Sequence, residues 1–239
     1  MSVSFCAKGR LGNNLFQYAA AYAFAKRTGQ PLIVPAFEHA ERFGLATEPS
    51  KTLMSMTSWV SWNEVGAGYR PIEQIPGKNL MLNGYFQSAK YFDDCQQDIR
   101  SLLPMKPLQG GVCAVHVRRG DYVGNPHYVD LAEQTDYYEK AYRKFLGMRF
   151  LFFSDDIHYC QRKFANWHAD FFVDSDPVAA MMSASMCGAK IIANSSFSWW
   201  WAFFGQGRII APDPQEKWYC GPSADINTND LIPEGWMTV

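Results

Sequence analysis

The chain has 239 residues, a formal net charge of −1 and only 19% charged residues. This length suits one large domain or two small ones and is sufficient to bury a core. The near-neutral charge excludes the broad basic face that nucleic-acid binding requires. Six cysteines without a CxxC pair favour free thiols in a reducing compartment over a disulfide framework or a zinc site.

The hydropathy pattern predicts neither a targeting segment nor a membrane segment. The N-terminal sequence MSVSFCAKGRLG has no long apolar run behind a basic start, so it is not a signal peptide. The longest aromatic run, Phe197–Phe204, is too short to span a bilayer. We therefore expect a cytoplasmic protein without a transmembrane segment.

The first part of the chain begins as strand, glycine-punctuated loop, helix and strand. Apolar residues recur at helical spacing from Leu15 until Gly29 ends the helix. Residues 36–79 contain many glycines and prolines and read as loops. In chain order, we expect strands at Val3–Cys6, Pro31–Val34 and Leu80–Tyr85, with helices at Leu15–Thr28 and Lys90–Leu103.

The second part alternates strictly between strands and helices, after a linker candidate at Pro104–Gly111. Strict alternation predicts a parallel, doubly wound sheet. We expect strands at Val112–Val117, Arg149–Phe153, Phe171–Val173, Lys190–Ala193 and Arg208–Ala211. The helices expected between them are Asp136–Phe145, Asp156–Trp167, Pro177–Cys187 and Phe197–Phe204, the last a core helix rather than a sugar platform.

The segment Val112–Tyr122, VCAVHVRRGDY, is the most informative part of the chain. Its apolar half predicts a buried strand. Its polar half offers two planar guanidinium groups that match phosphate oxygens, and Gly120 permits close approach of the backbone. The structural alternative is a surface loop whose arginines pair with Asp121 and other acids.

Polar side chains follow several of the predicted strands. His116 and Arg118–Asp121 end the first, Ser154–Asp156 end the second, and Asn194–Ser196 end the fourth. Ligands of open α/β sheets bind outside the carboxyl ends of the strands. Phosphate-binding arginines, carboxylates for a purine edge and hydroxyls at a helix start together favour a nucleotide site.

A metal site is not predicted. Asp174-Ser175-Asp176 has the DxD pattern of some metal-dependent nucleotide-sugar enzymes. However, Asp176 precedes Pro177 at a helix start, so the helix N-cap is the favoured interpretation. The chain has neither a GxGxxG motif nor a P-loop.

These motifs resemble those of a known family. HVRRGDYV, FFSDD, NGYFQSAKYF and ANSSFSWWWAFF closely resemble the motif series of the α-1,2-fucosyltransferases, family 11 of the glycosyltransferases. GRLGNNLFQYA is similar to that family's GGLGNQMFQYA, and also to the GRFGNQ of the protein O-fucosyltransferases. The resemblance spans roughly residues 5–211, with the motifs in the same order.

The resemblance implies an α/β fold of the GT-B-like class, with two facing Rossmann-like halves and parallel sheets. Residues 1–107 would form the acceptor-side domain and residues 108–239 the GDP-fucose-binding domain. The implied activity is metal-independent, inverting transfer of L-fucose from GDP-β-L-fucose to the 2-hydroxyl of a galactose-containing glycan. No cofactor beyond this donor substrate is expected, and a homo-oligomeric state stays open.

The family motifs also imply roles for individual residues. Arg118 would hold the β-phosphate, and Asn13 would face the fucose and the acceptor. His116 and either Asp155 or Asp156 would contact guanine or ribose, and Ser195, Ser196 and Ser198 would contact the phosphates. Ser154 and Asn194 would be further donor-binding residues. On the acceptor side we expect Arg10, Asn14 and His127.

The chemistry of the reaction agrees with these roles. Negative charge develops on the β-phosphate as GDP departs, and a fixed arginine stabilises it without a metal. The general base for the acceptor hydroxyl is either Asp121 or His127, of which Asp121 is favoured, although it can instead orient the arginines.

The chain departs from the family pattern at three positions. Arg10 replaces the second glycine of GGLGN, Asn14 replaces glutamine, and Trp201 replaces the glycine of SWWGAW. These differences concern the acceptor and the linkage more than the donor. Two alternatives remain: transfer of another nucleotide-activated sugar or to another hydroxyl, and a binding module without catalysis. The presence of Asn13, Arg118, Asp121 and the serines opposes the second.

Overall fold

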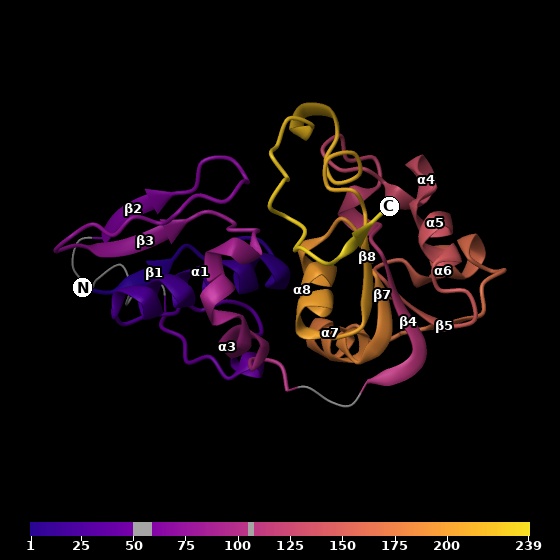
Figure 1. The fold of residues 1–239 in the computed structure, drawn as a ribbon, viewed down its shortest axis with the longest axis horizontal. Coiled ribbons are helices and arrows are strands. Elements are labelled where there is room, and N and C mark those ends of the chain that lie inside the picture. The colour runs from indigo at the N-terminus through magenta and orange to yellow at the C-terminus, as the bar shows by residue number, and fades with distance from the viewer. Residues whose placement is uncertain (50–58, 105–107) are drawn as a thin grey trace. The chain divides into compact units, whose positions relative to one another are not determined.

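The computed structural model describes residues 1–49, 59–104 and 108–239. The chain divides into two compact units, Met1–Leu103 and Pro104–Val239 (Figure 1). The predicted boundary between residues 107 and 108 and part of the linker candidate fall at residues 105–107, outside the described residues. None of the helices described is both long enough and apolar enough to cross a membrane.

The first unit contains a three-stranded parallel sheet in the order β1-β3-β2. Its strands are β1 (Val3–Phe5), β2 (Trp59–Asn63) and β3 (Asn79–Asn83), and its helices are α1 (Leu11–Thr28), the 3₁₀ segments Ala40–Phe43 and Ala89–Cys95, and α3 (Gln96–Arg100). The long helix α1 ends at Gly29, whose φ of 64° is the left-handed conformation that glycine adopts readily.

Three sequence predictions for this unit were wrong. Pro31–Val34 forms only an isolated bridge between Leu32 and Val3, because the segment pairs with the edge of β1 at a single position. The helix expected over Lys90–Leu103 is a 3₁₀ segment followed by the short α3, with Phe92 in a non-helical conformation at the kink. The loop-rich region 36–79 contains β2, although residues 50–58 lie outside the description.

The second unit is a six-stranded parallel sheet in the order β6-β5-β4-β7-β8-β9. Its strands are β4 (Gln109–Val117), β5 (Arg149–Ser154), β6 (Ala169–Phe171), β7 (Cys187–Ile191), β8 (Arg208–Ala211) and β9 (Met237–Thr238). Its helices are α4 (Leu131–Gln134), α5 (Tyr137–Arg143), α6 (Ile157–Lys163), α7 (Pro177–Ser185) and α8 (Ser196–Phe204), with 3₁₀ turns at Gly120–Tyr122 and Gly221–Ser223. The predicted alternation and parallel sheet are confirmed; α4 and β9 were not predicted. The strand expected at Phe171–Val173 lies instead at Ala169–Phe171, and the helix expected over Pro177–Cys187 ends at Ser185, because Cys187 begins β7.

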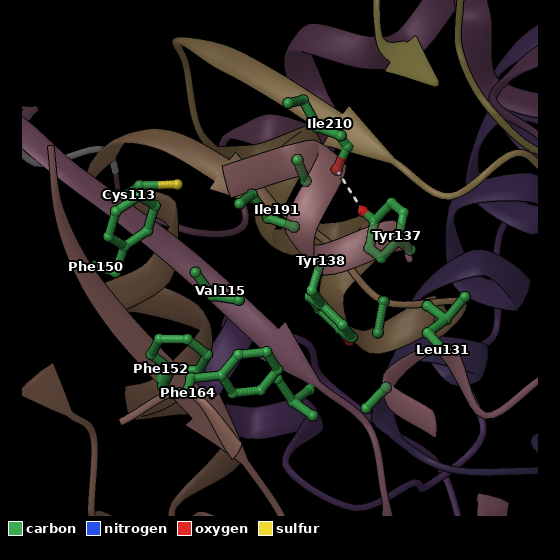
Figure 2. Close-up of a cluster of buried hydrophobic side chains, with 14 of the residues drawn as sticks. Cys113, Val115, Leu131, Tyr137, Tyr138, Phe150, Phe152, Phe164, Ile191 and Ile210 are labelled. Atoms are coloured by element: carbon green, nitrogen blue, oxygen red, sulfur yellow. Dashed lines mark hydrogen bonds between the residues drawn. The ribbon is translucent and has the colours of Figure 1, made fainter. Parts of the chain in front are cut away.

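The central strand β4 packs against helices on both of its faces, as Figure 1 shows. Cys113, Val115 and Val117 point into a cluster with side chains of α4, α5 and α6. Figure 2 shows part of this cluster, in which Tyr137 donates a hydrogen bond to the carbonyl of Ile210 (3.1 Å). His116 lies between Val115 and Val117 in β4 and points to the opposite face of the sheet, where its ring contacts Trp201 of α8. The sequence period of two along β4 therefore separates the two layers of helices.

The aromatic helix α8 is a core element, as predicted. Trp199, Trp200 and Trp201 are fully buried.

All six cysteines are free thiols, which confirms the preference against a disulfide framework. Burial raises the pKa of Cys113 and Cys187, and therefore these thiols are inert packing groups rather than nucleophiles.

A lysine is buried in the sheet of the second unit. Lys190 in β7 is 0% exposed, and its ammonium donates hydrogen bonds to the carbonyls of Cys187 and Gln206, both at 2.7 Å. Gly205 leaves room for it, since a Cβ there would lie 2.5 Å from the Lys190 Cε. Burial lowers the pKa of Lys190 to about 8.

The lowered pKa predicts a pH-dependent stability. Between pH 8 and 10.5 the unfolded chain binds more protons at this lysine than the folded chain, so its contribution to the unfolding free energy rises with pH. The expected gain is on the order of 2–3 kcal/mol across that window. Urea denaturation of the wild type and of Lys190→Met at pH 7 to 10.5 measures it.

The comparison between the two proteins measures the effect of the lysine together with its effect on the neighbouring thiol. Burial raises the pKa of Cys187 to about 11, which acts with the opposite sign, and the Lys190 charge lowers that pKa in the wild type only. The difference in unfolding free energy between wild type and variant should therefore change steadily with pH. Parallel curves would contradict the prediction.

Candidate functional site

The carboxyl ends of three neighbouring strands meet at one edge of the second sheet. β4 pairs with β5 through Val117 and Ser154, and with β7 through Val115 and Ile191. The polar segments that follow these strands are therefore brought to the same edge, as the sequence predicted. The nearest contacts among them involve Arg118, Asp121, Asp155 and Asn194.

Arg118 is held by two carboxylates. One terminal nitrogen of its guanidinium bonds Asp155 and the other bonds Asp121 in the following 3₁₀ turn. The arginine side chain is 13% exposed, whereas Asp121 is 54% exposed and Asp155 29%. The pairing of the loop's arginines with Asp121 and other acids, expected for a structural loop, is therefore present. This pairing also holds the Arg118 guanidinium at the sheet edge.

The Asp155 carboxylate has a second partner. Its other oxygen accepts a hydrogen bond from the backbone N–H of Arg119 at 2.9 Å. Gly120 makes this approach possible, because a Cβ there would lie 2.4 Å from the Asp155 carboxylate oxygen. Asp155 therefore ties the end of β5 to the loop after β4.

Arg119 has different surroundings from those of its neighbour. Its guanidinium pairs with Asp130 at 2.5 Å, and both side chains are only 11% exposed. The Tyr159 ring lies beneath it, with the guanidinium carbon 3.9 Å from the ring centroid. Arg119 therefore stabilises the loop, while Arg118 faces the strand-end edge.

Tyr122 completes the loop, and the sequence analysis did not identify it. Its hydroxyl donates to the backbone carbonyl of Asn194 at 2.8 Å, which joins the β4 loop to the β7 loop. Its ring stacks on Tyr128 with centroids 4.3 Å apart and planes 12° apart. Burial raises the pKa of Tyr122, so the hydroxyl stays protonated as a donor.

The residues after β7 are mostly used to shape the loop. The Asn194 amide donates to the carbonyls of Val129 and Trp218. The Ser195 hydroxyl caps α8 by accepting from Phe197, and the fully buried Ser198 bonds backbone groups of Ala193 and Ser195. Ser196 is half-buried. Because the Ser198 side chain is fully buried, its hydroxyl is not exposed for direct contact with a phosphate.

The residues after β5 include a second cap. The Asp156 carboxylate accepts from the Tyr159 N–H at 2.9 Å and caps α6. The Ser154 hydroxyl accepts from the Asp156 N–H, also at 2.9 Å. Among the acids of this segment, Asp155 is thus the one that faces the arginine, and Asp156 shapes the helix start.

His116 lies in an aromatic environment. It is 4% exposed, and its ring centroid lies 4.8 Å from that of Trp201 and 5.9 Å from that of Phe197. Burial, and then the charge of Arg118, lower its pKa to about 3. The imidazole is therefore neutral near pH 7. Its Nδ1 has no hydrogen-bond partner among the described residues.

The acceptor-side residues fall in two places. Arg10, Asn13 and Asn14 belong to the start of α1 in the first unit, where Asn13 accepts from the Gln87 amide at 2.8 Å and Asn14 is buried. His127 belongs to the second unit and is exposed, with its Nδ1 2.8 Å from the Ser223 hydroxyl. The structure describes these units individually, so the predicted grouping of Arg10, Asn14 and His127 on the acceptor side stays a prediction.

The DxD pattern is a helix cap. The Asp176 carboxylate accepts from the Val178 N–H at 2.9 Å, which confirms the capping interpretation. Within the described residues, His, Cys, Asp and Glu side chains form no group of three or more that could hold a metal ion.

Sequence reasoning missed the residues that support the site from a distance. Besides Tyr122, these are Asp130 and Tyr159, which hold Arg119. Tyr122 lies inside the quoted motif and could have been found there. The pairing of Arg119 with Asp130 depends on how the loop folds back, for which the sequence contains no periodic signal.

Comparison with solved structures places the fold in the GT-B-like class. The chain is similar to the NodZ α-1,6-fucosyltransferase in a crystal soaked with GDP-fucose, with a TM-score of 0.54 and 12% sequence identity. The similarity covers 90% of this chain and 96% of that chain. At this identity the likeness concerns the fold alone.

The names of three sequence relatives describe sugar-transferring enzymes. The O-antigen biosynthesis glycosyltransferase WbnK of Escherichia coli is 24% identical, over 98% of this chain and 99% of its own. The α-1,2-colitosyltransferase of Escherichia coli is 32% identical over 65% of this chain and 61% of its own. The galactoside α-(1,2)-fucosyltransferase 2 of Pongo pygmaeus is 24% identical over 84% and 68%.

The decisive comparison is with a family model. The model of glycosyl transferase family 11 matches residues 66–216, which is more than half of the chain and includes the strand-end loops of the second unit. The chain is a glycosyltransferase of the fucosyltransferase family and belongs to glycosyl transferase family 11.

Proposed function

We propose that the protein transfers L-fucose from GDP-β-L-fucose, with inversion, to the 2-hydroxyl of a galactose-type acceptor. The observation that carries the proposal is the Arg118 guanidinium at the strand-end edge of the second sheet, within the region matched by the family. An arginine at that edge suits the pyrophosphate of a nucleotide sugar. Similarity to the galactoside α-(1,2)-fucosyltransferase supports the linkage.

In the proposed reaction, the bond between fucose C1 and the β-phosphate oxygen breaks, and its electron pair moves onto GDP. The acceptor 2-hydroxyl oxygen forms the new bond to C1 from the opposite face. Arg118 stabilises the charge that develops on the β-phosphate, where a preorganised donor contributes most. Asn13 orients the fucose and acceptor, and no metal takes part.

Asp121 and Asp155 each bond one terminal nitrogen of the Arg118 guanidinium, so an incoming phosphate competes with them for this group. Asp155 is additionally held by the Arg119 N–H, whereas Asp121 is the more exposed partner. We therefore expect the phosphate to displace Asp121. The carboxylate released in this way becomes available to take the proton of the acceptor hydroxyl, which links donor binding to base formation.

A second candidate is α-1,2 transfer of another sugar from its GDP donor. It is favoured by the 32% identity to the α-1,2-colitosyltransferase. The two candidates share the roles of Arg118 and Asp121 and differ in the sugar that is transferred.

Incubation with GDP-fucose and lactose tests the reaction. We expect mass spectrometry to find a fucosylated product, and glycosidase digestion to assign an α-1,2 linkage. The same activity should persist in EDTA, because an arginine supplies the positive charge. A product formed only from GDP-colitose would favour the second candidate, and metal-reversible loss in EDTA would contradict a metal-free site.

Replacement of Arg118 should affect mainly the chemical step. We expect Arg118→Ala to lower kcat by about 10²–10³-fold, the range for removal of one preorganised donor from a developing oxyanion. Arg118→Lys should not restore activity, because a compact ammonium lacks the planar fork. Steady-state kinetics, with circular dichroism to verify folding, measures both variants.

Arg119→Ala is the matched control for Arg118. It removes a partner of the buried Asp130 and should lower the unfolding free energy by about 3 kcal/mol, the scale for breaking a buried ion pair. Its turnover per folded molecule should stay near the wild-type value. A folded Arg118→Ala with normal turnover would refute the role assigned to Arg118.

Replacement of Asp121 should separate binding from chemistry. Asp121→Asn removes a negative charge that competes with phosphate for Arg118, so GDP should bind more tightly, by a few-fold. Loss of a general base should at the same time lower kcat by about 10²–10⁴-fold. Calorimetry with GDP and steady-state kinetics give the two values. Weaker GDP binding with unchanged kcat would contradict the exchange.

A further inference from the structure

The first unit contains a strained turn at the carboxyl end of its central strand. Gly84–Gln87 follow β3, and Phe86 has a φ of 54°, which is uncommon for a residue with a side chain. The Phe86 ring is fully buried, while the neighbouring Tyr85 is 44% exposed. Strain of this kind persists only where the surroundings enforce it and is concentrated at functional sites.

Glu64 holds this turn in place. Its carboxylate accepts hydrogen bonds from the backbone N–H groups of Tyr85 (2.7 Å) and Phe86 (3.0 Å), and from the Tyr91 hydroxyl (3.3 Å). Gly84 allows the approach, since a Cβ there would lie 2.4 Å from the Glu64 Cβ. One carboxylate thus satisfies two consecutive backbone donors and enforces the left-handed residue.

Gln17 joins the same turn to the loop after β1. Its amide nitrogen donates to the carbonyls of Gly84 (3.2 Å) and Lys8 (3.1 Å), and its amide oxygen accepts from the Lys8 N–H (3.2 Å). Gln17 is fully buried in α1. Two strand-end loops are therefore fixed to each other by a buried polar group whose hydrogen bonds all reach backbone atoms.

The rigid turn presents a ring surrounded by polar groups. The Lys8 ammonium lies 4.9 Å from the Tyr85 ring centroid and donates to the Asn83 amide oxygen at 3.1 Å. The Asn83 amide in turn donates to Asn63 at 2.7 Å. A partly exposed aromatic ring beside hydrogen-bonding groups offers an apolar face and polar partners at one place.

We infer that Tyr85, Lys8 and Asn83 form a saccharide-binding surface, which we call the Tyr85 platform, and that its ligand is the acceptor glycan. The ring would carry the C–H face of one sugar residue, and the amide and ammonium groups would bond its hydroxyls. The position at strand ends agrees with where α/β sheets bind ligands. The inference rests on the proposed function and deepens it by naming residues that hold the acceptor.

A purely structural role does not require this arrangement. A surface lysine on a tyrosine ring needs neither a left-handed residue nor two buried polar side chains that fix the backbone beneath it. The buried Phe86 already supplies packing to Trp62 and Tyr91. Glu64 and Gln17 satisfy backbone groups of the loop and, in doing so, also fix the outward presentation of Tyr85, which a bound ligand can use.

Kinetics of Tyr85 variants test the platform. We expect Tyr85→Ala to raise the KM for lactose about 3–10-fold, the scale of one aromatic contact. The KM for GDP-fucose and kcat at saturating lactose should stay unchanged. Tyr85→Phe keeps the ring and should retain most of the affinity. Val65→Ala, at a 70% exposed apolar residue of the same unit, is the control and should change neither KM.

Glu64→Ala tests the positioning of the ring. This variant leaves Tyr85 intact but removes the acceptor of its N–H, so it should raise the KM for lactose as Tyr85→Ala does and leave the KM for GDP-fucose unchanged. The double variant should then add little to either single one, because both act on the same contact. Full additivity, with circular dichroism verifying both folds, would contradict a positioning role.

Ligand-observed saturation-transfer NMR separates the platform from the proposed reaction. Lactose should give a signal with the wild type that Tyr85→Ala weakens and Val65→Ala does not. If no fucose is transferred but this pattern holds, the platform stands and the proposed function fails. If fucose is transferred while Tyr85→Ala keeps a wild-type lactose KM and signal, the platform is wrong and the proposed function stands.

Discussion

The site in the second unit depends on the Asp155 carboxylate, which joins two neighbouring strand ends. It bonds the Arg118 guanidinium with one oxygen and the Arg119 N–H with the other. This is possible only because Gly120 has no Cβ in the space that the carboxylate occupies. A mobile arginine side chain thereby becomes a preorganised group, which is the condition under which a charge contributes to stabilising a developing anion.

Adjacent arginines have opposite uses because the loop turns between their side chains. Arg119 is paired with the buried Asp130 and covered by the Tyr159 ring, so its charge stabilises the loop. Arg118 pairs with Asp121 and Asp155, whose side chains are more exposed than that of Asp130. An incoming anion can therefore compete for Arg118 far more readily than for Arg119.

The two units use a similar device at their strand ends. In the second unit, Tyr122 bonds the carbonyl of Asn194 and links the loops after β4 and β7. In the first, Gln17 links the loops after β1 and β3 through backbone atoms. In each case a side chain from another segment satisfies loop backbone groups that the sheet leaves unpaired, and it fixes polar residues beside them.

The sequence by itself determined the elements with a strong local period: the alternation of the second unit, the parallel sheet and the strand-end grouping of Arg118, Asp155 and Asn194. Parallel strands necessarily end at one edge, so this grouping needs no knowledge of individual contacts. Only the tertiary structure decided the partners, such as Glu64 beneath Tyr85 or Asp130 beside Arg119. It also reduced Pro31–Val34 to a single bridge. The reason is that periodicity records which face of an element is buried, whereas ion pairs and strained turns depend on residues distant in the chain that local pattern does not connect.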